Sequence, residues 1–112
     1  MKINFKDLEE IKLVELSGDV DANTAPEIQK QTLPLAKPGS KIIMDMTNVP
    51  YMSSAGLRML LSLYRRAAAE EGKLVLVGLS EDLQDTMSVT GFLDFFSTSE
   101  TLEEALAILN SV

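Results

Sequence analysis

The sequence predicts an α/β domain in which a mixed, mostly parallel sheet of four to five strands packs with about four helices. Two observations support this class. Apolar runs of strand length alternate with helical patterns in the order ββαβαβαβα, and glycine and proline separate the segments. The 112 residues suffice for one hydrophobic core and are too few for two, so a single domain is expected over residues 1–112.

The first third of the chain predicts a hairpin and a helix. Ile11–Leu16 has the composition of a strand, and Ile3–Phe5 is expected to be its short partner across a charged turn. Thr24 followed by Glu27 is the pattern of a capping box, and a proline lies in the first turn after it. A helix is therefore predicted from Ala25 to Leu35.

The middle of the chain predicts a strand, a long helix and a second strand. Lys41–Met46 has strand character, and residues 55–71 carry apolar side chains at helical spacing. Gly72 is expected at the first position after that helix, where a left-handed conformation is common. The continuous apolar run Leu74–Val77 is typical of a parallel strand buried on both faces.

The last third predicts two helices around a short strand. Ser80 is placed to cap a helix over residues 81–89. Three phenylalanines between residues 92 and 96 are expected to surround a short final strand, with one of them near the sheet edge. Thr101 and Glu104 form a second capping-box pattern, ahead of a C-terminal helix with an apolar stripe.

Composition excludes several classes of function. The chain has no cysteine, histidine or tryptophan, so disulfides, Cys or His zinc sites, thiol nucleophiles and Ser-His-Asp triads are impossible. We expect no cofactor and no metal site. The net charge is −7, and no basic stripe is apparent in the sequence, so nucleic acid is not an expected partner.

Nothing in the sequence predicts export or a membrane span. The first ten residues lack the apolar run of a signal peptide, and no apolar stretch approaches the ~20 residues that a spanning helix needs. The expected protein is cytoplasmic and soluble, and a monomer is the default expectation.

The most informative stretch is Pro50–Arg58, where a predicted strand passes into a predicted helix. Ser53 or Ser54 can serve simply as the helix N-cap. Gly56 is harder to explain, because a glycine in the first helical turn costs about 1 kcal/mol relative to alanine. Its presence predicts that another backbone or a ligand comes close to this turn.

Two chemical interpretations of the same stretch differ in class. Ser54-Ala55-Gly56 resembles the second half of a nucleophile elbow, but Met52 replaces the first glycine and no histidine can act as base, so an enzyme is not expected. Alternatively, a serine at a helix N-terminus is a favourable place for a phosphate, because free N–H groups and the helix dipole stabilise the added charge. Phosphorylation would then block a partner without unfolding the domain.

Taken together, these segments resemble the STAS domain family, and within it the bacterial anti-sigma factor antagonists. The resemblance covers nearly the whole chain. The matching segments are Gly18–Asp21 with Thr24-Ala25, Ile42–Met46, Tyr51–Leu57, Leu74–Gly78 and Thr101–Leu106.

The resemblance implies a function. Unphosphorylated antagonists of this family bind an anti-sigma factor that is also a serine kinase, and this binding releases a sigma factor. The kinase phosphorylates a serine or threonine at the start of the helix after the second main strand, and a phosphatase removes the phosphate. When Gly56 and Leu57 are aligned, Ser54 resembles the phosphoacceptor, and Ser53 is the alternative acceptor.

The resemblance also implies a partner-binding surface, with Arg58 and Met59 on an exposed first helical turn and Asp21 in the neighbouring loop. Two positions depart from the family pattern: Ser53 replaces a frequent aspartate, and Ala55 a frequent serine or threonine. The expected partner-binding residues are Asp21, Thr24, Ser53, Ser54, Ala55, Gly56, Arg58 and Met59.

A second hypothesis follows from the missing aspartate at position 53. The chain would then be a STAS binding subunit of a larger assembly, such as a transporter accessory protein or a nucleotide-sensing module, without control by phosphorylation. The absence of a glycine-rich phosphate loop disfavours the nucleotide-sensing version.

Overall fold

The computed structural model describes residues 1–110, which form a five-stranded sheet in the order β1-β2-β3-β4-β5. β1 pairs antiparallel with β2, and β2 to β5 are all parallel. This confirms the predicted α/β class and the order of elements. The strands are β1 Lys2–Leu8, β2 Ile11–Ser17, β3 Lys41–Asn48, β4 Lys73–Val77 and β5 Ser97–Ser99.

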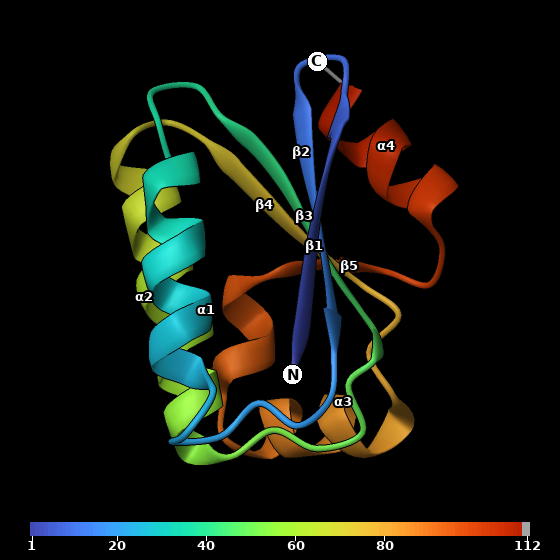
Figure 1. Cartoon of the computed structure of the whole chain (residues 1–112). Coiled ribbons are helices and arrows are strands. Elements are labelled where there is room, and N and C mark those ends of the chain that lie inside the picture. Colours follow the sequence, from blue (N-terminus) through green and yellow to red (C-terminus); the bar gives the residue numbers. More distant parts are fainter. Residues whose placement is uncertain (111–112) are drawn as a thin grey trace.

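Helices cover both faces of this sheet (Figure 1). α1 and α2 lie side by side against one face, and α4 lies against the opposite face. The long helix begins and ends within two residues of its predicted limits, whereas the first α-helix stops three residues early and continues as a 3-10 turn. The helices are α1 Ala25–Thr32, α2 Ser54–Ala69, α3 Glu81–Val89 and α4 Leu102–Asn110, with 3-10 turns η1 Leu33–Leu35 and η2 Phe92–Phe95.

The central strands divide the apolar residues between two cores. In β4, Leu74 and Leu76 face the larger core under α1, α2 and α3, whereas Val75 and Val77 face the smaller core under α4. This alternation follows from the two-residue period of a strand. It confirms that 74–77 is a strand buried on both faces.

The start of α3 follows the sequence-based prediction, whereas the end of α2 does not. Ser80 caps α3, since its Oγ accepts a hydrogen bond from the Leu83 N–H at 3.1 Å. The expectation for Gly72 is wrong: Glu71 takes the left-handed conformation after α2, with φ 58°. Gly72 serves close packing instead, because a Cβ there would lie 2.7 Å from Ser40 Oγ.

The final strand lies after the phenylalanines, which occupy η2 and the residue that follows it. Phe95 is exposed and lies near the sheet edge, as expected for one of the three. Between residues 1 and 110, no helix is both long and apolar enough to cross a membrane.

Removal of a buried side chain from α2 tests the larger core. Leu60 is fully buried there. Leu60→Ala is expected to lower the free energy of unfolding by about 2–5 kcal/mol, because it leaves a cavity. Ser62→Ala, at an exposed position of the same helix, is the control and is expected to change it by less than about 0.5 kcal/mol. Urea denaturation followed by circular dichroism measures both; equal shifts would contradict the assigned packing.

Candidate functional site

Two loops meet where adjacent parallel strands end. One loop joins β2 to α1 and the other joins β3 to α2. The Val20 N–H donates to the Tyr51 carbonyl at 2.9 Å, and the Ser53 N–H donates to the Val20 carbonyl at 2.8 Å. A third bond runs from the Gly18 N–H to the Asn48 carbonyl at 3.0 Å. The carboxyl ends of β2 and β3 thus continue as one hydrogen-bonded platform, where α/β sheets commonly bind ligands and partners.

Gly56 allows the first turn of α2 to approach this platform. A Cβ at Gly56 would lie 2.6 Å from Met52 Cγ and 2.8 Å from the Val20 carbonyl oxygen. Real Cβ atoms essentially never come so close to a neighbour, so the Met52 side chain and the Val20 backbone would have to shift. The expectation that another backbone comes close to Gly56 is confirmed, and that backbone belongs to the β2–α1 loop.

The two adjacent serines have different roles. Ser53 is the N-cap of α2, and its Oγ accepts a long hydrogen bond of 3.4 Å from the Gly56 N–H. Ser54 is the first residue of the helix and its side chain is exposed. Within the described chain, neither hydroxyl is hydrogen-bonded to a side chain that could act as a base, so the arrangement does not resemble an activated nucleophile.

Asp21 shapes the neighbouring loop. Its Oδ1 accepts hydrogen bonds from the N–H groups of Asn23 at 2.9 Å and Thr24 at 3.1 Å. The predicted capping box is wrong, because the Thr24 side chain makes no cap bond to α1. Thr24 Oγ1 instead donates to the Asp19 carbonyl at 2.8 Å and accepts from the Asp21 N–H at 3.0 Å. Loop closure, rather than helix capping, is what this threonine provides.

The remaining predicted site residues lie at different depths. Arg58 is exposed and Ala55 is half-buried, so both are accessible at the start of α2. The expectation of an exposed Met59 is wrong, since its side chain is 2% exposed and belongs to the larger core. Gly56 is buried as well. Position 59 points inward because it belongs to the buried face of α2, together with Leu60 and Leu63.

Tyr51 is a surface residue that the sequence-based site omitted. It lies three residues after the end of β3, in the loop that carries the two serines, and 53% of it is exposed. Its backbone carbonyl is held by Val20, so the position from which the ring projects is fixed. Its sequence signal was a large aromatic residue beside a proline at a strand end. Exposed tyrosines are frequent anchors of protein interfaces.

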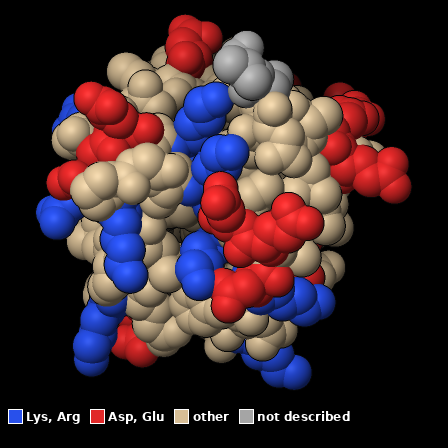
Figure 2. Space-filling model, turned by 90° about the horizontal axis from the view of Figure 1, so that it is seen from above, with Lys and Arg blue, Asp and Glu red and all other residues tan. Residues whose placement is uncertain are grey.

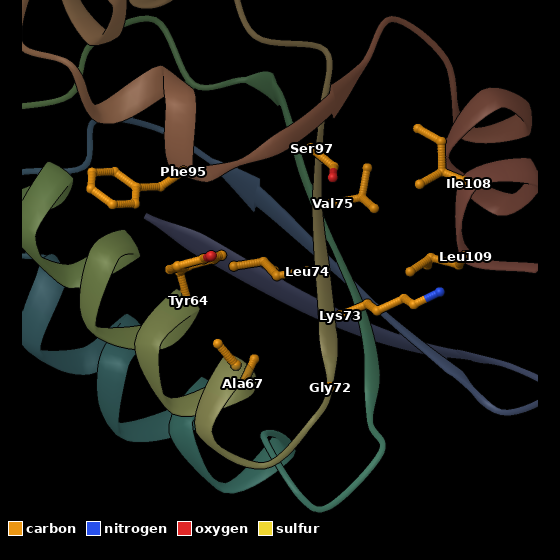
Figure 3. Close-up of a pocket in the computed structure, with 11 residues that line it drawn as sticks. Tyr64, Ala67, Gly72, Lys73, Leu74, Val75, Phe95, Ser97, Ile108 and Leu109 are labelled. Carbon is orange, nitrogen blue, oxygen red and sulfur yellow. The ribbon is translucent and has the colours of Figure 1, made fainter. Parts of the chain in front are cut away.

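A hollow lies at the end of the sheet opposite to the loop platform, where β4 begins (Figure 3). Its cavity volume is about 380 Å³, and Tyr64, Leu74 and Phe95 line one side while Ile108 and Leu109 of α4 line the other. The hollow forms because β5 pairs only with Val75–Val77 and leaves the start of β4 without a neighbour on that side. It is separate from the loop platform, since the parallel strands place their first and last residues at opposite ends.

Comparison with known proteins supports the sequence resemblance. Residues 2–105 match the family model of the STAS domain. The chain belongs to the STAS domain family. It is 28% identical over 103 residues to the anti-sigma-B factor antagonist of Bacillus subtilis, covering 92% of this chain and 94% of that protein. It is 32% identical over 96 residues to the Listeria monocytogenes anti-sigma-B factor antagonist, covering 84% and 82%.

Solved structures show the same fold. The anti-sigma factor antagonist SpoIIAA in its unphosphorylated form matches with a TM-score of 0.78 and 19% identity, over 99% of this chain and 100% of that one. The phosphorylated form of SpoIIAA, a Bacillus cell fate determinant, matches with a TM-score of 0.74 and 20% identity, over 97% and 100%. The STAS domain fold of this chain is therefore shared over its whole described length.

The close approach at Gly56 predicts an unusual sign for a helix substitution. Replacing a helical glycine by alanine ordinarily stabilises a protein by about 0.5–1 kcal/mol. Gly56→Ala is instead expected to lower the free energy of unfolding by about 1–3 kcal/mol, because the new methyl group overlaps Met52 and Val20. Ser62→Ala, two turns further along α2, controls for the gain in helix propensity. An increase in stability for Gly56→Ala in urea denaturation would contradict the close approach.

Proposed function

We propose that this protein is an anti-sigma factor antagonist whose binding is switched by phosphorylation of Ser54. Unphosphorylated, it binds an anti-sigma factor serine kinase and thereby releases a sigma factor; phosphorylated, it does not bind. A protein serine phosphatase returns it to the binding form. The proposal rests mainly on the exposed hydroxyl of Ser54, which lies at the first position of α2 and beside the Asp21 loop.

The helix start favours Ser54 over Ser53 as the phosphoacceptor. The Ser53 hydroxyl already accepts the capping bond from Gly56, so its modification would remove a helix cap. The Ser54 side chain is exposed, and within residues 1–110 its hydroxyl makes no hydrogen bond that phosphorylation would have to break. A phosphate on Ser54 would lie near the unpaired N–H groups of the first turn, which stabilise negative charge. Modification is therefore compatible with the intact fold.

A phosphate on Ser54 would also oppose binding of the partner. The proposed partner surface comprises the predicted residues that remain accessible, namely Asp21, Thr24, Ser53, Ser54, Ala55 and Arg58, together with Tyr51. Gly56 would support this surface from beneath, and the nearly buried Met59 would lie at its base. A phosphate carries about two negative charges at neutral pH, and in the middle of a docked interface it would be desolvated without a partner.

Two further facts support an antagonist. Several relatives carry that name, among them proteins of Bacillus subtilis and Listeria monocytogenes. SpoIIAA, which shares the fold, exists in an unphosphorylated and a phosphorylated form. Both facts concern other proteins, and together with the exposed Ser54 they favour the same type of switch in this chain.

An alternative function follows from Ser53, which stands where the family frequently has aspartate. If the kinase requires that carboxylate, the chain would act as a constitutive STAS subunit of a larger assembly. The two functions differ in one measurable property, which is whether any kinase modifies Ser54.

Phosphorylation can be measured directly. The purified protein is incubated with ATP and the anti-sigma factor kinase encoded in its own genome, and its intact mass is determined. Wild type and Ser53→Ala are expected to gain the mass of one phosphate, whereas Ser54→Ala is expected to gain none. Incorporation into Ser54→Ala but not Ser53→Ala would move the acceptor to Ser53. No incorporation into any of the three, with a kinase that modifies another substrate, would favour the constitutive subunit.

Binding to the same kinase tests the surface. Ser54→Asp introduces a charge at the proposed centre and is expected to weaken binding about tenfold or more, which corresponds to at least ~1.4 kcal/mol. Tyr51→Ala is expected to weaken it by a similar factor through loss of an aromatic anchor. Phe5→Ala is the matched control, because Phe5 is also an exposed aromatic residue but lies on the edge strand β1. Isothermal titration calorimetry measures all three; unchanged affinity for Ser54→Asp and Tyr51→Ala would contradict the assigned surface.

A further inference from the structure

The exposed face of α2 carries three arginines and no acidic residue. Arg58, Arg65 and Arg66 are all exposed, with Ser62 between them on the same face. Arg65 and Arg66 follow Arg58 by seven and eight residues, about two helical turns, and Ser62 lies three or four residues from each arginine, so the four share one side of the helix. We call Arg58, Arg65 and Arg66 the arginine ridge. No basic stripe is apparent in the sequence, but the helix brings together on one side arginines that are separated along the chain.

Charge is distributed unevenly over the whole molecule. Residues 74–112 contain acidic side chains and no lysine or arginine, so every basic residue of this acidic chain lies before position 74. Figure 2 shows Lys and Arg interspersed with Asp and Glu at the side of α1 and α2, and acidic side chains at the side of α4. The arginine ridge is thus a local basic surface on a protein of net charge −7.

The ridge has no internal counter-ions. The ion pairs between residues 1 and 110 are Lys6 with Glu15 and Lys12 with Asp7, all on the β1–β2 hairpin. Glu70 and Glu71 follow the end of α2, but neither carboxylate comes within 4.0 Å of an arginine of the ridge. The three guanidinium groups therefore remain available for carboxylates of another molecule.

The stability of the helix does not explain Arg58. Arg58 is the fifth residue of α2, and helical side chains tilt toward the N-terminus of their helix. The positive end of the helix dipole disfavours a cation there by about 0.3–1 kcal/mol. Arg66, in the last turn, is favoured by the same dipole. The helix dipole therefore gives no reason for a cation at position 58.

A shallow depression adjoins the ridge between α1 and α2. It has a volume of about 250 Å³, and small or apolar residues form much of it, among them Ala25 and Pro26 of α1 and Ala55 and Met59 of α2. Arg58 and Ser62 line the same depression. An apolar side chain of a partner could enter here while carboxylates beside it reach the guanidinium groups.

We propose that the α1–α2 face binds an acidic segment of the partner protein, with one apolar side chain in this depression and carboxylates paired with the arginine ridge. This inference rests on the proposed function, because it takes the partner to be the kinase that acts on Ser54. It adds the chemistry of the partner's contact: a surface rich in Asp and Glu, attracted by opposite charge to a protein that is itself acidic.

The geometry also links the ridge to the switch. Ser54 and Arg58 are one helical turn apart, a spacing at which side chains of a helix interact. A phosphate on Ser54 would compete with the partner's carboxylates for the Arg58 guanidinium. Phosphorylation would therefore remove one of the attractive contacts in addition to introducing a repulsive charge.

Association kinetics test the inference. The rate constant for binding to the cognate kinase is measured by stopped flow at about 0.05 M and 0.5 M NaCl, since salt screens charge steering. The wild-type rate constant is expected to fall about tenfold or more at high salt. Arg65→Glu/Arg66→Glu, about three turns from Ser54, is expected to bind about tenfold more slowly at low salt and to lose most of the salt dependence.

The matched control is Lys6→Glu/Lys12→Glu, which changes the net charge equally on the β1–β2 hairpin, toward the opposite end of β2 from the loop platform. The two exposed ion pairs that it breaks contribute little to stability. This control is expected to change the rate constant by less than about threefold, because only the local field at the interface steers association strongly. Arg65→Gln/Arg66→Gln removes the cations without adding anions, and circular dichroism verifies that each variant is folded.

The outcomes separate the two proposals. If the kinase binds and phosphorylates Ser54, but the ridge variants behave like the control, the acidic contact is wrong and the proposed function stands. If the kinase neither binds nor phosphorylates the wild type, both proposals fail. Duplex DNA serves as a second probe: binding that is lost in the ridge variants would overturn the acidic partner in favour of nucleic acid.

Discussion

The hydrogen bonds of the Val20 backbone hold the functional end of this molecule together. Val20 donates to Tyr51 and accepts from Ser53, so two loops that are far apart in the sequence form one surface at the ends of β2 and β3. Gly56 lets α2 start directly against that surface. The exposed position of Ser54 depends on this arrangement, because the cap, the turn and the loop are fixed relative to one another.

This constraint separates the packed part of the site from the part whose side chains are exposed. Ser53, Gly56 and Met59 are occupied with capping and packing, and any change there would disturb the start of α2. Exposed side chains project from the same backbone at Ser54, Arg58 and Tyr51, and these side chains are not part of the core. A switch that must change binding and leave the fold intact needs this division, because a phosphate adds charge and volume that a packed position could not accept.

The distribution of charge makes one face of the molecule differ from the others in its interaction with a charged partner. An acidic chain with its basic residues confined before position 74 can attract an acidic partner to one face while repelling it from others. The arginine ridge meets this condition only because α2 turns residues 58, 65 and 66 to one side. The net charge of −7 by itself would predict repulsion of an acidic partner. It does not describe the local charge, because it sums residues that lie on different faces of the folded protein.

The sequence by itself determined the class of fold, the order of elements and the two-sided burial of β4, because these depend on local periodicity and on the lengths of apolar runs. It also located the serine–glycine junction and the need for a close neighbour at Gly56. Only the tertiary structure decided that the neighbour is Val20, that Met59 points inward and that Thr24 closes a loop instead of capping α1. Contacts between distant segments decide these details. The hydrogen-bond partner and the burial of a side chain depend on which strand or loop packs beside it, and the local sequence does not identify that neighbour.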